Sequence, residues 1–222
     1  MKYTNADLFN ALFAPGDKIN IRVIPDAEGK PGNRLYLFPD VPLCAEYPDA
    51  FPCVGVNPRE TTRKLAAIKN MVIDIDGAPL PSWAKKHADI ICTRDKNHHH
   101  LYFCFENTTR DEFKKYSAAV IAHAGGDKSV SDPERVIRLP YFTHRKNGAE
   151  SEGYKIVFIR KNIERPTISE KFSWLPVTPK KEKAADPAPV QDYNSVLAFI
   201  RQTYMKKPVK GAGEGRSREL LL

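Results

Sequence analysis

The stretch MVIDIDG, residues 71–77, sets two carboxylates into an apolar run. Its β-branched residues favour a strand. Because side chains on a strand alternate between two faces, Asp74 and Asp76 project to the same side. Two unpaired carboxylates next to each other in a packed strand are unfavourable, and a bound cation or a basic partner relieves them. The simpler alternative is a strand that has already ended, with Asp74, Asp76 and Gly77 in a turn that faces water.

The composition is that of an ordinary globular protein with a basic excess. The chain has 222 residues, of which 41% are hydrophobic, enough for one sizeable core or one domain with a small appendage. Apolar runs are all too short to span a membrane. Lys and Arg total 35 against 27 acids, a formal charge of +8. This excess favours a polyanionic partner such as nucleic acid or a nucleotide, although a solvated basic surface would produce it too.

The cysteines and the N-terminus indicate a cytoplasmic protein. No C-x-x-C pair occurs among Cys44, Cys53, Cys92 and Cys104, which argues against a zinc ribbon and is compatible with reduced thiols. Cys44 and Cys53 could still supply half of a metal site. The first residues, MKYTNADLFNALFAPG, contain no small-residue cleavage site and are not typical of a secretion signal.

Hydrophobic periodicity predicts an α+β fold. We expect helices at residues 4–14, at 82–87 and, from a capping box at Thr109, from there to Gly125. Strands are expected at residues 19–24, 35–38, 71–77, 89–93, 98–105, 135–139 and 154–160, the first two forming a hairpin. Short links between them favour a mixed, largely antiparallel sheet with flanking helices.

The domain organisation follows from a change in composition near residue 163. We expect a catalytic body at residues 1–165 and a Pro-, Ala- and Lys-rich linker at 166–190. Residues 191–222 contain an amphipathic helix and the start of another, so we expect a small C-terminal helical segment that continues beyond Leu222 in a longer protein.

Three consecutive histidines begin the strand at residues 98–105. Alternation places Leu101, Phe103 and Phe105 on one face and His98, His100, Tyr102 and Cys104 on the other. If this strand lies beside the aspartate strand, His98 and His100 share a surface with the two aspartates. Neutral imidazole is a common metal ligand, whereas the alternative is a solvated polar strand end.

A third polar cluster is DPERVIRLP, residues 132–140. Asp132 precedes Arg135 and Arg138, and guanidinium groups suit phosphate oxygens. An acid that holds a cation beside arginines that hold phosphate fits nucleotide handling, and Lys146 extends the basic surface. Alternatively, Asp132 caps a turn and the arginines are ordinary surface residues.

The order of these three stretches resembles that of the archaeo-eukaryotic primase superfamily, most closely the replication-protein B type primases of plasmids and phages. The signature aspartate-proline-x-arginine-x-hydrophobe-arginine-leucine-proline of that family is met in full by residues 132–140. The resemblance covers about residues 50–160. It implies a primase-polymerase catalytic core that performs template-directed nucleotidyl transfer and makes primers on single-stranded DNA in plasmid or phage replication.

The resemblance also assigns roles to residues. Asp74, Asp76 and Asp132 match the acids that hold two Mg²⁺ or Mn²⁺ ions about 3.5–4 Å apart, one activating a 3′-hydroxyl and one stabilising pyrophosphate. His100 matches the histidine that contacts the incoming nucleotide, with His98 as a rival because RDKN replaces the usual Ser or Gly residues before it. Charge on phosphate would be neutralised by Arg135, Arg138 or Lys146.

Two further points follow from the same resemblance. The family usually has a glycine after the leucine-proline, where this chain has Tyr141. The implied partners are a single-stranded DNA template, nucleoside triphosphates and a helicase domain or protein on the C-terminal side.

Two other functions use some of the same residues. A rolling-circle replication nuclease holds a cation with His-x-His and uses a helix tyrosine as nucleophile, for which Tyr116 is the candidate. Those nucleases prefer a hydrophobic residue where this chain has His99, and a nuclease function would not explain the motif at residues 132–140. The second alternative is a non-catalytic module that binds an origin or a template.

Overall fold

The described part of the chain holds two four-stranded sheets and a separate hairpin. A computed structural model describes residues 2–25, 31–41, 50–146 and 149–175, all within one unit that spans Met1–Val177. Cys44 and the C-terminal helix predicted within residues 191–222 lie outside the described residues. Among the helices that are described, none is long and apolar enough to cross a membrane.

The sheets are antiparallel throughout their described pairings, and the predicted α+β fold is confirmed. The first sheet has the strand order β2-β1-β3-β7 and the second the order β10-β5-β6-β4. Their strands are β1 Lys18–Pro25, β2 Gly32–Leu37, β3 Ala50–Gly55, β4 Asn70–Asp76, β5 Ile90–Asp95, β6 His98–Cys104, β7 Val136–Arg138 and β10 Lys155–Ile159. A two-stranded hairpin joins β8 His144–Lys146 and β9 Ala149–Ser151.

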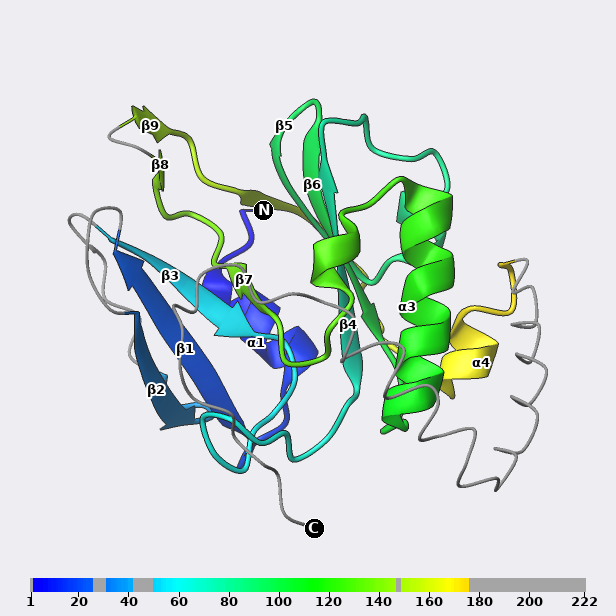
Figure 1. Cartoon of the computed structure of the whole chain (residues 1–222), viewed down its shortest axis with the longest axis horizontal. Helices are drawn as coiled ribbons and strands as arrows, with labels where there is room; N and C mark the ends of the chain where they lie inside the picture. Colours follow the sequence, from blue (N-terminus) through cyan, green and yellow to red (C-terminus); the bar gives the residue numbers. More distant parts are fainter. Residues whose placement is uncertain (1, 26–30, 42–49, 147–148, 176–222) are drawn as a thin grey trace, which may run out of the picture. The chain divides into compact units, whose positions relative to one another are not determined.

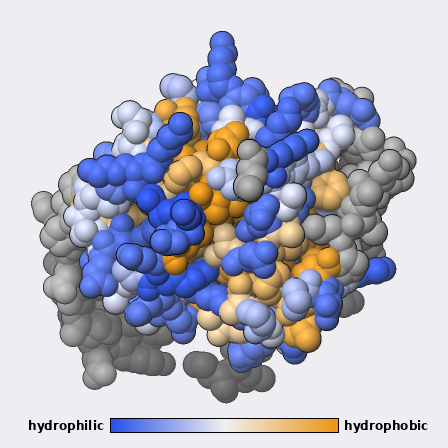
Figure 2. All heavy atoms as spheres, turned by 180° about the vertical axis from the view of Figure 1, so that it is seen from behind, coloured by the Kyte–Doolittle hydropathy of each residue, from blue (hydrophilic) through white to orange (hydrophobic). Residues whose placement is uncertain are grey.

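Both faces of the β10-β5-β6-β4 sheet are covered (Figure 1). On one face, side chains such as Val72 and Tyr102 pack with helix α1 (Asn5–Leu12) and with the β2-β1-β3-β7 sheet. On the other face, Ile73 and Phe103 pack against three helices, namely α2 (Ala84–His87), α3 (Arg110–Ala124) and α4 (Ile168–Lys171). Seen from behind, most of the surface is hydrophilic and the exposed hydrophobic residues gather in patches between (Figure 2).

The long helix α3 has the ends that its sequence predicts. Thr109 and Glu112 form a capping box at its start, and Gly125 ends it in the left-handed region at φ +67°. Helix α1 begins in the same way, with Thr4 and Asp7 in a capping box. Both caps satisfy backbone amides that the first turn of a helix leaves without partners.

Strand β3 is the main element that the sequence did not predict. Pro52 lies inside it, and proline usually excludes a segment from the interior of a sheet. Here β3 lies between β1 and β7, and the carbonyl of Pro52 accepts a hydrogen bond from the amide of Leu139. The β8–β9 hairpin was also not predicted.

The folded body extends past the boundary expected at residue 165. Ile168, Phe172 and Leu175 are buried against α3 and β6 side chains. Asp89, fully buried, pairs with Lys171 of α4 at 2.6 Å and with Arg160 at 3.2 Å. Residues 166–175 therefore belong to the body, and the rest of the expected linker lies outside the described residues.

Asn57, which is fully buried, joins three segments near the end of β3. Its amide nitrogen donates to the carbonyls of Asn70 and Pro133, and its oxygen accepts from the amides of Lys69 and Asn70, all at 2.8–3.1 Å. This residue therefore fixes the start of β4 relative to the segment that contains Asp132.

Replacing Asn57 by alanine should lower the free energy of unfolding by about 2–4 kcal/mol, because it leaves buried backbone donors and acceptors without partners. Urea denaturation measures the change. Ser82→Ala, at an exposed position, is the control and should stay within about 0.5 kcal/mol of the parent. Equal stability of Asn57→Ala and the control would contradict this role.

Candidate active site

The site begins with the pairing of β4 and β6. Asp74 lies opposite His100 and Asp76 opposite His98 in the antiparallel register. Directly opposite side chains on a sheet point to the same face and lie close together. The predicted neighbourhood of the aspartate strand and the histidine strand is therefore confirmed. The alternative of a solvent-facing turn at Asp74 is wrong, because β4 continues through Asp76.

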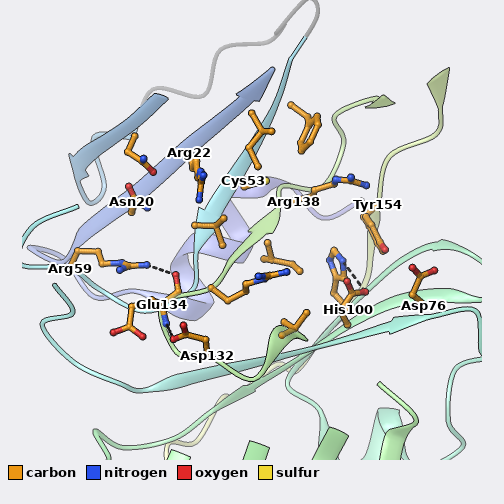
Figure 3. Close-up of a pocket in the computed structure, with 18 of the residues that line it drawn as sticks. Asn20, Arg22, Cys53, Arg59, Asp76, His100, Asp132, Glu134, Arg138 and Tyr154 are labelled. Atoms are coloured by element: carbon orange, nitrogen blue, oxygen red, sulfur yellow. Dashed lines mark hydrogen bonds and ion pairs between the residues drawn. The ribbon is translucent and has the colours of Figure 1, made fainter. Parts of the chain in front are cut away.

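These side chains open into a pocket of about 960 Å³ between the two sheets (Figure 3). All but one of the predicted site residues line it, namely Asp74, Asp76, Asp132, His98, His100, Arg135 and Arg138. The exception is Lys146, whose backbone belongs to β8 and whose side chain lies outside the described part of the structure. Residues from β4, β6, β7 and the segment before β7 thus meet in one cavity.

Asp74 carries the clearest electrostatic signal in the pocket. Burial and, after it, the negative charges of Asp76 and Asp127 together raise the pKa of Asp74 to about 6. One carboxylate oxygen, Oδ1, is buried without a hydrogen-bond partner among the described residues. A partly buried carboxylate beside other carboxylates is the arrangement that a divalent cation would relieve, so these residues fit Mg²⁺ or Mn²⁺.

His100 is held as a neutral imidazole. The side chain is 2% exposed and its ring stacks on Tyr154, with 3.7 Å between centroids. Burial and, after it, the positive charges of Arg138 and Arg94 together lower the pKa of His100 to about 3. Nε2 lies 3.6 Å from Oδ1 of Asp74, too far for a hydrogen bond, and a neutral ring makes no ion pair there. Nδ1 also lacks a hydrogen-bond partner among the described residues.

His98 occupies a different environment nearer the surface. Nε2 lies 2.7 Å from Oδ1 of Asp76, and Nδ1 lies 2.6 Å from Oδ1 of Asp95. Each ring nitrogen of His98 therefore lies within hydrogen-bond distance of a carboxylate oxygen. Both ring nitrogens of His98 thus already have carboxylate partners, whereas those of His100 have no hydrogen-bond partner among the described residues.

Asp132 lies at the other end of the pocket. Figure 3 places it beside Glu134 and Arg59, away from Asp76 and His100. Oδ1 accepts from the amide of Glu134, and contact with the Glu134 carboxylate raises the pKa of Asp132. Glu134 in turn pairs with Arg110, which lowers the pKa of Glu134. The structure therefore brings Asp132 into the same pocket as Asp74 and Asp76 but engages it with other partners.

Asp127 contacts Asp74 through the backbone, although the sequence did not single it out and it does not line the pocket. Its amide donates to the carbonyl of Asp74 at 2.8 Å. The close approach requires Gly126, where a Cβ atom would lie 2.8 Å from Ile73 Cγ2 and 3.1 Å from the Asp74 carbonyl. Ser129 donates to the Asp127 carboxylate and lowers its pKa. The sequence Gly125-Gly126-Asp127 after α3 was the one feature from which a close approach of Asp127 to another segment could have been predicted.

No group of three or more acids, histidines or cysteines within the described residues is already arranged as a metal site.

The β2-β1-β3-β7 sheet and the segment after β3 contribute cationic and amide side chains that the sequence did not reveal. Asn20 and Arg59 are 2% and 4% exposed yet line the pocket. Asn20 Oδ1, Arg22 Nε and Arg59 Nε are buried without hydrogen-bond partners in the described residues. Gly55 leaves space for Arg59, since a Cβ atom there would lie 3.2 Å from its guanidinium. This end of the pocket offers both donors and an acceptor to a ligand.

The tyrosine required by a rolling-circle mechanism lies on the wrong face of the sheet. Tyr116 is 9% exposed and stacks on Phe172 at 5.8 Å, within the cluster that α3 covers. His98 and His100 open to the opposite face. The sheet therefore separates the candidate nucleophile from the histidines, which argues against this alternative.

Tyr141 occupies the position at which the primases that this chain resembles usually have glycine, and its backbone has a conformation that favours glycine. Its φ is +68°, in the left-handed region that disfavours residues with a Cβ. The hydroxyl donates to the carbonyl of Tyr3 at 2.6 Å and accepts from the amide of Ile156. These hydrogen bonds offset the backbone strain and bind the segment after β7 to β10 and to the residues that precede α1.

Comparison with solved structures identifies the fold as that of primase catalytic domains. The AEP domain of the primase-polymerase of cyanophage S-2L matches with a TM-score of 0.58 and 16% identity, over 76% of this chain and 95% of that one. The primase RepB' matches with a TM-score of 0.55 and 12% identity, over 70% and 55%. Its catalytic domain in complex with initiator DNA matches with a TM-score of 0.53 and 10% identity, over 70% and 82%.

The predicted resemblance to archaeo-eukaryotic primases is thus confirmed at the level of the fold. No family model matches the sequence, and no curated protein matches it. At these identities the similarity defines the architecture, and the functional argument rests on the residues of the pocket.

The environment of Asp74 gives a stability that depends on pH. Its folded-state pKa of about 6 lies above its ordinary value of 3.8, so between these values the folded state binds more protons than the unfolded state. The stability contribution of Asp74 is therefore full below about pH 4 and is lost as the pH rises through about 6.

Without divalent cations, Asp74→Asn should be more stable than the parent at about pH 7.5 by about 2–3 kcal/mol, because asparagine cannot ionise. Denaturation at several pH values measures this difference, which should vanish below about pH 4. Asp76→Asn, at an exposed position, should show a smaller gain. A parent as stable as Asp74→Asn at neutral pH would contradict the assignment.

Proposed function

We propose that this chain is a primase-type nucleotidyltransferase, a primase or primase-polymerase that makes primers on single-stranded DNA in plasmid or phage replication. The observation that carries the proposal is the pairing of Asp74 and Asp76 with His100 and His98 at the mouth of an arginine-lined pocket. Solved primase domains support it through their fold, and one of them was determined with initiator DNA. We further expect nucleoside triphosphates and a helicase as partners, in the cytoplasm.

The acids of the pocket would hold the metal. Bound Mg²⁺ or Mn²⁺ would activate the attacking 3′-hydroxyl and stabilise the pyrophosphate leaving group. Asp74 and Asp76 supply two carboxylates from one face of β4, which suits ions that take one or two carboxylates together with waters and substrate phosphate. For a third carboxylate, the sequence signature selects Asp132, which lines the pocket. Asp127 is the alternative, because its backbone amide bonds to the carbonyl of Asp74 and its charge raises the pKa of Asp74.

The histidine and the arginines would position the triphosphate. His100 has an unpartnered ring nitrogen, a fixed ring plane and a neutral state, so it can donate one hydrogen bond to a phosphate oxygen. Arg138 and Arg135 line the pocket from β7 and the segment before it, where their guanidinium groups would bind phosphate and neutralise developing charge. His98 is the weaker candidate for nucleotide contact, because Asp76 and Asp95 already occupy both of its nitrogens.

The template would occupy the other end of the pocket. Arg22 and Arg59 offer donors that suit phosphate oxygens, and Asn20 offers an acceptor that phosphate cannot satisfy but a base amino group can. A nucleotide of a single strand presents both kinds of group. Its neighbour, the incoming nucleotide, would then lie toward His100 and Asp74.

Primer synthesis is the direct test. Asp74→Asn and Asp76→Asn should abolish metal-dependent incorporation of labelled nucleotide on a single-stranded template without a supplied primer, while template binding measured by fluorescence anisotropy persists. Full activity in either variant would refute the assignment. Template binding by the parent without any incorporation, in Mg²⁺ or Mn²⁺, would instead favour the non-catalytic module.

The third carboxylate can be identified with a matched pair of variants. Asp127→Asn should reduce primer synthesis by roughly 100-fold or more if Asp127 completes the metal site, whereas Asp132→Asn should then have a smaller effect. The variants change the charge equally and lie on the same segment before β7. The reverse order of the two losses would assign the third position to Asp132.

A further inference from the structure

A second group of aromatic and cationic side chains lies on the opposite face of the β10-β5-β6-β4 sheet from the acidic pocket. Trp83, just before α2, and Trp174, after α4, lie 5.0 Å apart between ring centroids. Both pack against the hydrophobic cluster that contains Ile73 and Phe103. Because strand side chains alternate, this face points away from Asp74 and His100.

Two histidines extend this group. His87 stacks on Trp174, with 4.1 Å between centroids and 19° between planes. His123, at the end of α3, lies 5.5 Å from Trp83 and 5.4 Å from Trp174. We call Trp83, His87, His123 and Trp174 the tryptophan cluster. None of the four is fully buried, and His123 is exposed, so the cluster presents aromatic surface to solvent.

The surroundings of the tryptophan cluster are positive. Lys85 and Lys86 precede His87 on α2, are exposed, and make no ion pair with any described residue. Burial lowers the pKa of His87, and the charges of Lys86, Arg160 and Lys171 lower it further. Arg160 and Lys171 share one carboxylate, that of Asp89, which compensates only one of their two charges.

Half-buried rings next to unpaired cations are suited to a single strand of nucleic acid. Bases stack on aromatic faces regardless of sequence, and lysines pair with the phosphates between them. We propose that the tryptophan cluster is a second contact surface for single-stranded DNA, with Lys85 and Lys86 contacting phosphates. This surface binds without metal or nucleotide and is independent of the proposed nucleotidyl transfer.

Tryptophan fluorescence can test whether DNA binds at this surface. The chain has two tryptophans, and both belong to the cluster, so their fluorescence reports on this face and on no residue of the acidic pocket. The 222-residue chain should be titrated with fluorescently labelled oligothymidylate, without divalent cations or nucleotides. We expect tryptophan emission to be quenched along the same saturation curve as the rise in oligonucleotide anisotropy.

Matched lysine variants locate the phosphate contacts. Lys85→Ser/Lys86→Ser should weaken the quenching and lower the slope of log K against log salt by about 1.4, about 0.7 for each lost contact. Lys114→Ser/Lys115→Ser removes the same charge from exposed positions on α3 and should leave the quenching unchanged.

Three results would overturn the proposal: no binding, binding without a change in tryptophan emission, or equal losses in the two lysine variants. Asp74→Asn separates this proposal from the catalytic one, because it should quench like the parent even when primer synthesis is lost. If the parent chain showed quenching but made no primers, the proposed enzyme would be refuted and this surface would stand.

Discussion

The arrangement of the site depends on the backbone register between β4 and β6. That pairing sets Asp74 opposite His100 and Asp76 opposite His98, while Ile73 and Ile75 point into the core beneath α3. A slip of one residue would bury the carboxylates and expose the isoleucines. Because both faces of the sheet are covered, the core enforces the one register that brings the acids to the pocket.

Opposite charges then enter the pocket from different parts of the fold. β4 contributes acids, while β1 and β7 of the other sheet contribute Arg22 and Arg138. The segment between α3 and β7 crosses from one sheet to the other. Gly126 holds its beginning against Asp74, and Asn57 holds Pro133 to the start of β4. The folded chain thereby places carboxylates and guanidinium groups in one pocket, an arrangement that suits the proposed transfer of a nucleotide.

The elements with strong local signals could be predicted from the sequence. The capping box at Thr109, the hairpin of β1 and β2, and the alternation around Asp74 and His100 each depend on neighbours in the chain. The pocket depends on distant pairings instead. Strand β3 carries a proline that local rules exclude, and without β3 the positions of Arg22 and Arg59 relative to the acids could not be inferred. Asp127 was missed because its approach to Asp74 is created by packing at Gly126.

The most direct test of this account is the position of Mn²⁺ in crystals of the protein soaked with Mn²⁺ and a nucleoside triphosphate, located by anomalous scattering. We predict a peak bound by carboxylate oxygens of Asp74 and Asp76, with the triphosphate between His100 and Arg138. An ordered triphosphate elsewhere, or Mn²⁺ bound without contact to either aspartate, would contradict it.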